Sequence, residues 1–177
     1  MLKPIKSKSL RGDGTRLAIV ASQYNARYVN AMVGAAKAEL KRAGVKTVQI
    51  IRVPGAFEIP VVAAHLARTN SSHASRITDH FSRTSRLAPR TPSLSAIICL
   101  GVILRGETVH AAHIGEAVSR TLMQIQVRYE LPVIHEVLLL ENEEQARVRC
   151  LGLKHNRGAE AAQTALAMVC LMQTICL

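Results

Sequence analysis

Aromatic side chains are scarce in this sequence, which has no tryptophan, three tyrosines and two phenylalanines in 177 residues. Acidic residues are also few, and the formal net charge is +11. The excess lies in residues 1–16 and 68–92, each with five cationic residues and one aspartate. Proteins that hold single-stranded nucleic acid stack its bases on aromatic rings, and Phe81 is the single aromatic ring in either segment. We therefore predict solvated charge in preference to a nucleic-acid partner, with binding of nucleic acid or of an anionic cargo through these segments as an alternative.

Long hydrophobic runs are absent as well. The longest run near the C-terminus, residues 165–172, is far below the roughly 18 residues that cross a bilayer. Residues 1–16 are basic and polar, and they lack the apolar middle region of a secretory signal. These features predict a cytoplasmic protein with no membrane partner.

Cysteine is infrequent, and its four positions lack both the paired spacing of zinc sites and the density of disulfide scaffolds. We expect reduced packing residues at Cys99, Cys150, Cys170 and Cys176. His110 and His113 are three positions apart, a spacing that can bind a metal ion, but neither a second carboxylate nor a cluster of cysteines supports such a site. The sequence therefore predicts no metal site.

The chain is long enough for one buried core, and 49% of its residues are hydrophobic. We predict a basic tail over residues 1–16 and a single domain over residues 17–177. Residues 68–95 are rich in serine, threonine, arginine and proline, with too little apolar content to pack. This stretch is predicted to be a surface insertion.

Four short apolar runs alternate with segments of helical spacing. The predicted strands are residues 17–22, 47–53, 96–104 and 132–140. A helix is predicted between the first two strands, ending at a left-handed cap at Gly44, and another is predicted after an N-cap at Asn142. Further helices are predicted over 59–67, around 114–125 and over 159–174. This alternation predicts an α/β fold, a three-layer α/β/α sandwich in which helices cover both faces of a four-stranded parallel sheet.

Polar and aromatic residues follow the predicted strands. Because the ligand crevice of such a sheet lies beyond the carboxyl ends of its strands, the loops there are expected to converge. Tyr24 offers a flat surface for a heterocycle, and Glu58 offers a carboxylate for sugar hydroxyls. Residues 106–108 are predicted to open a helix whose free amides suit a phosphate.

Four ordered stretches resemble the lumazine synthase family, and they are spread along nearly the whole predicted domain outside the insertion. They are Ala21-Ser-Gln-Tyr-Asn25, Val53-Pro-Gly-Ala-Phe-Glu-Ile-Pro60, Gly101-Val-Ile-Leu-Arg-Gly-Glu-Thr-Val-His110 and Lys154-His-Asn-Arg-Gly-Ala159. The resemblance implies a flavodoxin-like subunit that makes 6,7-dimethyl-8-ribityllumazine, phosphate and water, the penultimate step of riboflavin biosynthesis. Its implied substrates are 5-amino-6-(D-ribitylamino)uracil and 3,4-dihydroxy-2-butanone 4-phosphate, and it implies no cofactor.

The resemblance also implies roles for particular residues. The implied catalytic residues are His110, for proton transfer, and Arg149, which reaches the phosphate from the adjacent subunit. The implied substrate-binding residues are Tyr24, Asn25, Ala56, Phe57, Glu58, Ile103, Leu104, Gly106, Glu107, Thr108, His135 and Arg157. Active sites are implied at the contacts within a homo-oligomer, which is a pentamer or a sixty-subunit shell of pentamers.

Two positions depart from the family pattern. His135 stands where the family normally contributes an aromatic residue from the neighbouring subunit to cover the pyrimidine, and Arg157 stands where it usually has lysine. Because an imidazole is the smaller ring, weaker pyrimidine binding is predicted. Two alternatives stay open: a non-catalytic flavin or lumazine binder that kept the cavity, and a riboflavin synthase of the same subunit fold.

Overall fold

A four-stranded parallel sheet forms the centre of the computed structural model, which describes residues 12–75, 93–152 and 155–175. The strands are β1 (Arg16–Ser22), β2 (Thr47–Val53), β3 (Ala96–Leu104) and β4 (Val133–Leu140), in the order β2-β1-β3-β4. The helices are α1 (Ala26–Arg42), α2 (Ile59–Ser75), α3 (His110–Tyr129), α4 (Glu143–Cys150) and α5 (Arg157–Ile175), with a short 3-10 helix, η1 (Ala56–Glu58), before α2.

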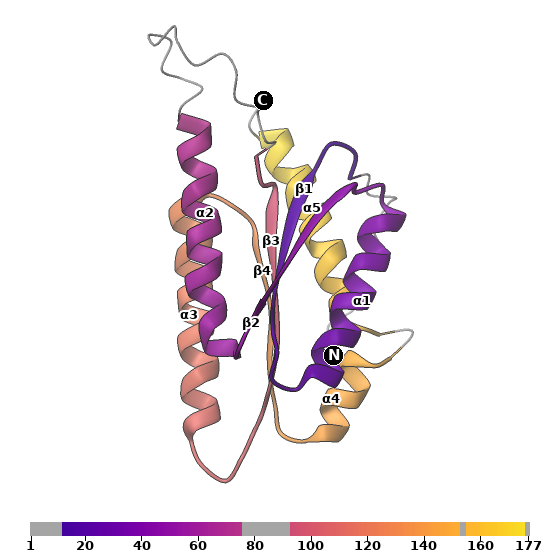
Figure 1. The fold of residues 1–177 in the computed structure, drawn as a ribbon, viewed down its shortest axis with the longest axis vertical. Helices are drawn as coiled ribbons and strands as arrows, with labels where there is room; N and C mark the ends of the chain where they lie inside the picture. Colours follow the sequence, from indigo (N-terminus) through magenta and orange to yellow (C-terminus); the bar gives the residue numbers. More distant parts are fainter. Residues whose placement is uncertain (1–11, 76–92, 153–154, 176–177) are drawn as a thin grey trace, which may run out of the picture.

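Helices cover both faces of this sheet (Figure 1). Helices α1, α4 and α5 pack on one face, α2 and α3 pack on the other, and each side has its own core of buried apolar residues. In the central strand β1, residues 17–21 are all fully buried, as expected for a parallel strand that is covered twice. The predicted α/β/α sandwich with a four-stranded parallel sheet is confirmed.

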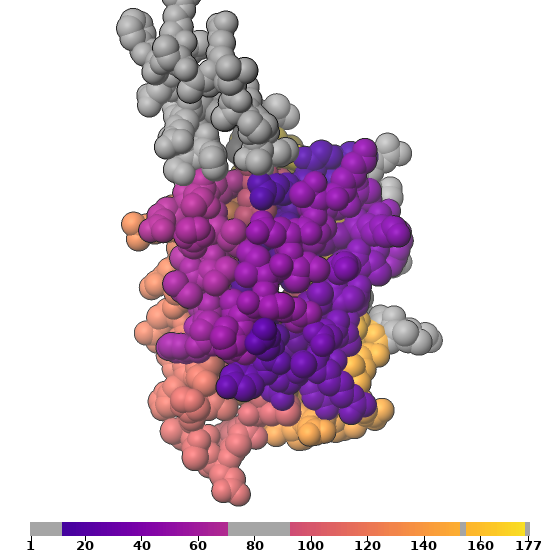
Figure 2. Space-filling model, in the orientation of Figure 1, coloured from indigo at the N-terminus to yellow at the C-terminus, as the bar shows by residue number. Residues whose placement is uncertain are grey.

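Strand β2 lies at one edge of the sheet, and most of its residues are exposed or half-buried. Figure 2 shows its purple surface between α1 and α2.

In the part of the chain that the structure describes, no helix is both long enough and apolar enough to span a membrane.

The predicted strand bounds are correct to within one residue, and two predicted caps are confirmed. Gly44 follows α1 with a φ of +85°, the left-handed conformation that glycine adopts without a Cβ penalty. The Asn142 side chain accepts a hydrogen bond from the Gln145 amide at 2.9 Å and so caps α4. These local signals hold because they depend on residues only a few positions apart.

The predicted end of α2 at residue 67 is wrong, because the helix continues to Ser75. The Thr69 hydroxyl bonds to helix carbonyls, and the Asn70 side chain holds Leu94 by donating to its carbonyl and accepting from its amide. Leu94 is buried against the core. Both ends of the expected insertion, residues 68–75 and 93–95, therefore belong to the fold, while residues 76–92 lie outside the described residues.

Candidate active site

The loops after β1, β2 and β3 lie at one end of the sheet, as predicted (Figure 1). Backbone hydrogen bonds join the first two of them. The Gln23 amide donates to the Val53 carbonyl at 2.8 Å, and the Tyr24 amide donates to the Pro54 carbonyl at 3.2 Å. The two loops therefore form one surface.

Tyr24 and Glu58 meet at Gly55. The Gly55 amide donates to a Glu58 carboxylate oxygen at 2.8 Å. A Cβ atom built on Gly55 would lie 3.2 Å from the Tyr24 ring and 2.8 Å from that oxygen, so any larger residue would push the two side chains aside. The Tyr24 ring nevertheless remains 72% exposed. A flat ring and a carboxylate thus share one open surface, which suits a ligand with a heterocycle and hydroxyl groups.

Asn25 holds this surface to the sheet. Its backbone has a left-handed φ of 55°, and its side-chain amide donates to the Val102 carbonyl of β3 at 2.8 Å. The side-chain amide of Asn25, an implied substrate-binding residue, is therefore engaged within the chain. Its contribution here is to fix the loop that carries Tyr24.

The loop over residues 105–109 projects from the carboxyl end of the sheet, visible as the salmon tip of Figure 2. Its base is anchored, because the Arg105 amide donates to the Leu140 carbonyl at 2.8 Å and its guanidinium contacts both Glu141 oxygens. The predicted phosphate-binding residues, Gly106, Glu107 and Thr108, are all exposed. Ile103 is buried and Leu104 half-buried at the strand end.

The prediction that residues 106–108 open α3 is wrong, because the helix begins at His110 with Val109 as its N-cap. The Thr108 hydroxyl accepts a hydrogen bond from the His110 amide at 3.4 Å, and this kind of side-chain bond competes with helix extension. His110 is exposed, and its ring has no hydrogen-bond partner among the described residues. The imidazole is therefore free to meet a ligand.

His135 does not lie at the carboxyl end of the sheet. It is half-buried on the edge strand β4, and its Nε2 is 2.9 Å from the Ser119 hydroxyl of α3. Burial lowers the pKa of His135, which favours the neutral ring. It lies five positions before Leu140, the last residue of β4, which is roughly 16 Å along the strand. Its expected contact with a pyrimidine would therefore have to be made with another subunit.

Arg149 and Arg157 lie on α4 and α5, across the sheet from Phe57 and His110. Arg149 is exposed in the last turn of α4. Arg157 bonds instead to Glu136 at 3.0 Å and to Glu160 at 2.7 Å. One chain thus brings Tyr24 and Glu58 together at Gly55, while both arginines lie on the opposite face of the sheet from His110.

Glu136 was missed by the sequence analysis. Burial raises its pKa more than the adjacent Arg157 lowers it, and the resulting pKa is about 7. The available signal was an acidic residue inside the apolar run of β4, a position that normally requires a partner charge.

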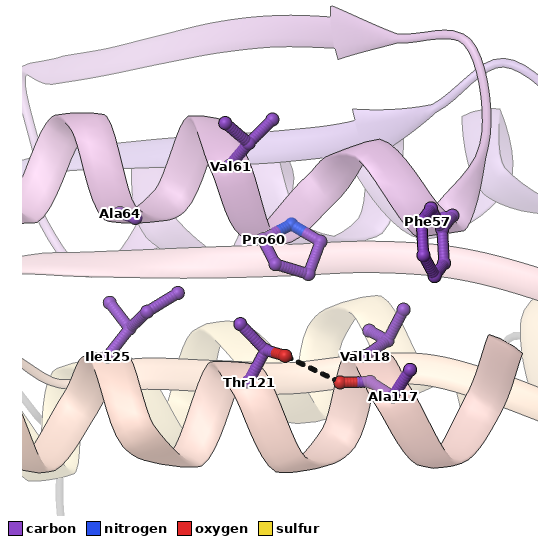
Figure 3. A pocket seen from close by; sticks show the side chains of 8 residues that line it. All are labelled: Phe57, Pro60, Val61, Ala64, Ala117, Val118, Thr121 and Ile125. Carbon is purple, nitrogen blue, oxygen red and sulfur yellow. Dashed lines mark hydrogen bonds between the residues drawn. The ribbon is translucent and has the colours of Figure 1, made fainter.

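An apolar groove of about 320 Å³ separates α2 and α3 (Figure 3). Its walls are Phe57, Pro60, Val61 and Ala64 on one side and Ala117, Val118, Thr121 and Ile125 on the other. Thr121 bonds to the Ala117 carbonyl of its own helix at 2.7 Å, so its hydroxyl is satisfied. Phe57 and Val61 are 60% and 68% exposed, so this apolar groove is open to solvent.

Among the described residues, no group of three or more His, Cys, Asp and Glu side chains is placed to hold a metal ion. The side chains that meet at Gly55 are the Glu58 carboxylate and the Tyr24 ring.

Comparison with known proteins agrees with this geometry. The family model for 6,7-dimethyl-8-ribityllumazine synthase matches residues 14–173. The enzyme of that name from Xylella fastidiosa (strain 9a5c) is 36% identical over 168 residues, which is 94% of this chain and 95% of the relative. Those from Stenotrophomonas maltophilia (strain R551-3) and Xanthomonas oryzae pv. oryzae (strain PXO99A) are each 34% identical, over at least 92% of both chains. The chain belongs to the 6,7-dimethyl-8-ribityllumazine synthase family.

Proposed function

We propose that this protein is a transferase that condenses 5-amino-6-(D-ribitylamino)uracil with 3,4-dihydroxy-2-butanone 4-phosphate to form 6,7-dimethyl-8-ribityllumazine. The observation that carries the proposal is the meeting of Tyr24 and Glu58 at Gly55, in a chain of this family. This surface offers a stacking plane beside a carboxylate, the two features that a ribityl-bearing pyrimidine requires. The predicted cytoplasmic location remains part of the proposal.

In the proposed binding mode, Tyr24 stacks on the pyrimidine while Ala56, Phe57 and Glu58 hold the ribityl chain. Backbone groups of Ile103 and Leu104 face the pyrimidine edge. The exposed loop over residues 106–108 binds the phosphate of the second substrate, and His110 begins the next helix. Binding both reactants at one surface converts a bimolecular reaction into an effectively unimolecular one.

The proposed chemistry begins when the pyrimidine amine attacks the ketone and a Schiff base forms with loss of water. Phosphate is then eliminated, and the resulting enol tautomerises. The ribityl-bearing nitrogen closes the ring with loss of a second water. His110 moves protons in these steps, for which an imidazole suits because it both accepts and donates near neutral pH.

The site is proposed to be completed by a second copy of the chain. Arg149 lies across the sheet from His110, so it reaches the phosphate only from a neighbour. The exposed apolar groove between α2 and α3 adjoins Phe57 and gives that neighbour a surface to cover. Following the family resemblance, we propose that these copies form a ring of five subunits, either alone or as part of a sixty-subunit shell.

The direct test is the appearance of the lumazine absorbance band when purified protein is mixed with both substrates. The proposal predicts a rate well above the uncatalysed background. A rate equal to background in correctly assembled protein would contradict it and favour a non-catalytic binder. A protein that instead converts the lumazine to riboflavin would be a riboflavin synthase.

A further inference from the structure

Glu136 places a carboxylate where an apolar side chain is expected. It lies in β4 between His135 and Val137, and only 8% of its surface is exposed. A buried carboxylate requires a cation or several hydrogen bonds, since its desolvation is costly. The Arg157 Nε supplies the hydrogen bond at 3.0 Å.

Several charged groups face Glu136 from the two helices packed behind β4. Arg157 and Glu160 come from α5, and Arg149 comes from α4. Arg157 binds both carboxylates, with Glu160 at 2.7 Å. Arg149 has no hydrogen-bond or ion-pair partner in the part of the chain described, although its charge acts on Glu136 and on the neighbouring Cys150 thiol.

Asn156 ties the two helices together. Its side-chain amide donates to the Cys150 carbonyl at the end of α4, and its side-chain oxygen accepts from the Gly158 amide at 2.9 Å. The two arginines are thereby held near the same buried carboxylate. Arg157 is thus bound to Glu136, while the charge of Arg149 acts on Glu136 without a hydrogen bond.

We propose that Arg157 is a positioning residue that occupies Glu136 and so keeps the Arg149 guanidinium free for the phosphate of the butanone substrate in the adjacent subunit. This inference rests on the proposed role of Arg149. It assigns Arg157 an indirect part in the reaction, in place of the direct substrate contact that the resemblance implies.

The competition that the proposal describes depends on the charge of Glu136. Without Arg157, an ionised Glu136 has Arg149 as its remaining nearby cation, and pairing withdraws Arg149 from the substrate. A protonated Glu136 exerts no such pull. With Arg157 present, the pKa of Glu136 is already raised to about 7 by burial, and loss of Arg157 removes two contributions that lower it, so the withdrawal grows as the pH rises through the alkaline range.

The experiment measures KM for each substrate from pH 6 to pH 9, always as the ratio of variant to wild type. In Arg157→Gln, the ratio for the butanone phosphate is expected to rise with pH, reaching roughly ten-fold or more, the loss expected for one charged hydrogen bond. The ratio for the pyrimidine should stay nearly constant. Adding Glu136→Gln to Arg157→Gln should restore the butanone phosphate KM, because the competing carboxylate is gone.

Three results separate the possible failures. A raised KM that is independent of pH and is not restored in the double variant would overturn the inference and show direct contact by Arg157. An Arg149→Ala variant with unchanged KM for the butanone phosphate would instead overturn the proposed role of Arg149. If light scattering shows that Arg157→Gln fails to assemble, Arg157→Lys takes its place, because lysine keeps a cation beside Glu136. This variant should show a nearly wild-type KM for the butanone phosphate. A ten-fold rise of that KM in Arg157→Lys would also contradict the inference.

Discussion

The exposed imidazole of His110 stands at the first residue of α3, where the loop over residues 105–109 ends. A positioned general acid and base typically contributes roughly 10²–10⁴-fold to a rate. We expect His110→Ala to lower kcat by that factor, measured by lumazine absorbance. His113→Ala, which removes an exposed imidazole less than one turn further along the helix, is the matched control and should leave kcat within about two-fold. Equal rates for His110→Ala and wild type would remove His110 from the mechanism.

Glu136 makes the stability of the protein depend on pH. Burial raises its pKa from the ordinary value of 4.5 to about 7, so between these values the folded protein holds a proton that the unfolded chain has lost. Stability therefore falls as the pH rises through this window, and a rise of about 2.5 in pKa corresponds to about 3 kcal/mol. Denaturant unfolding from pH 5 to pH 8 should show a decline in wild type that Glu136→Gln lacks.

The control for this measurement is Glu144→Gln, which removes an exposed carboxylate whose pKa Arg147 lowers. That variant should keep the wild-type decline. A decline of the same size in Glu136→Gln would contradict the assignment of the titration to Glu136.

Individual site residues were predicted unevenly from the sequence. Tyr24 and Glu58 were predicted to share a site because each lies in a loop that follows a strand, and the structure brings them together at Gly55, while their role stays a prediction. The engagement of Arg157 by Glu136 was not found, since the two residues are 21 positions apart and meet only when α5 packs behind β4.

The contact between α1 and α5 depends on a glycine. A Cβ atom at Gly158 would lie 2.0 Å from the Met32 carbonyl oxygen, so Gly158→Ala must force the two helices apart. We expect it to lower the free energy of unfolding by about 3 kcal/mol or more, the upper range for overpacking. Gly34→Ala is the opposite case: its Cβ meets nothing within 4 Å on the exposed side of α1, and it should add up to about 1 kcal/mol. Equal thermal midpoints for the two variants would contradict this packing.

Secondary structure was predicted well where local chemistry decides it. The four strands are apolar runs, and the Gly44 and Asn142 caps depend on near neighbours. The end of α2 was mispredicted because residues 68–75 look like a polar loop in the sequence. Their helix is stabilised by Asn70, which binds Leu94 from 24 positions away.

Assembly is predicted to depend on the groove between α2 and α3. Val61 is 68% exposed on its wall, so an aspartate there would put an unpaired charge into the proposed subunit contact. We expect Val61→Asp to produce smaller particles in light scattering and to lose activity in parallel. Val61→Ala keeps the surface apolar and should keep the assembly. Wild-type particle size for Val61→Asp would place the contact elsewhere.

The sharing of each active site between two copies of the chain is tested most directly by mixing two inactive variants. In a head-to-tail ring, a site takes His110 from one subunit and Arg149 from its neighbour. Subunits carrying His110→Ala and subunits carrying Arg149→Ala would therefore rebuild intact sites when co-expressed.

Random mixing in equal amounts should make about a quarter of the sites intact, because each needs the right variant on both sides. If each site is shared between two subunits, lumazine formation by the mixed assembly recovers to about that fraction of the wild-type rate. Activity no greater than the average of the two separate variants, in particles shown to contain both chains, would contradict a site shared between subunits.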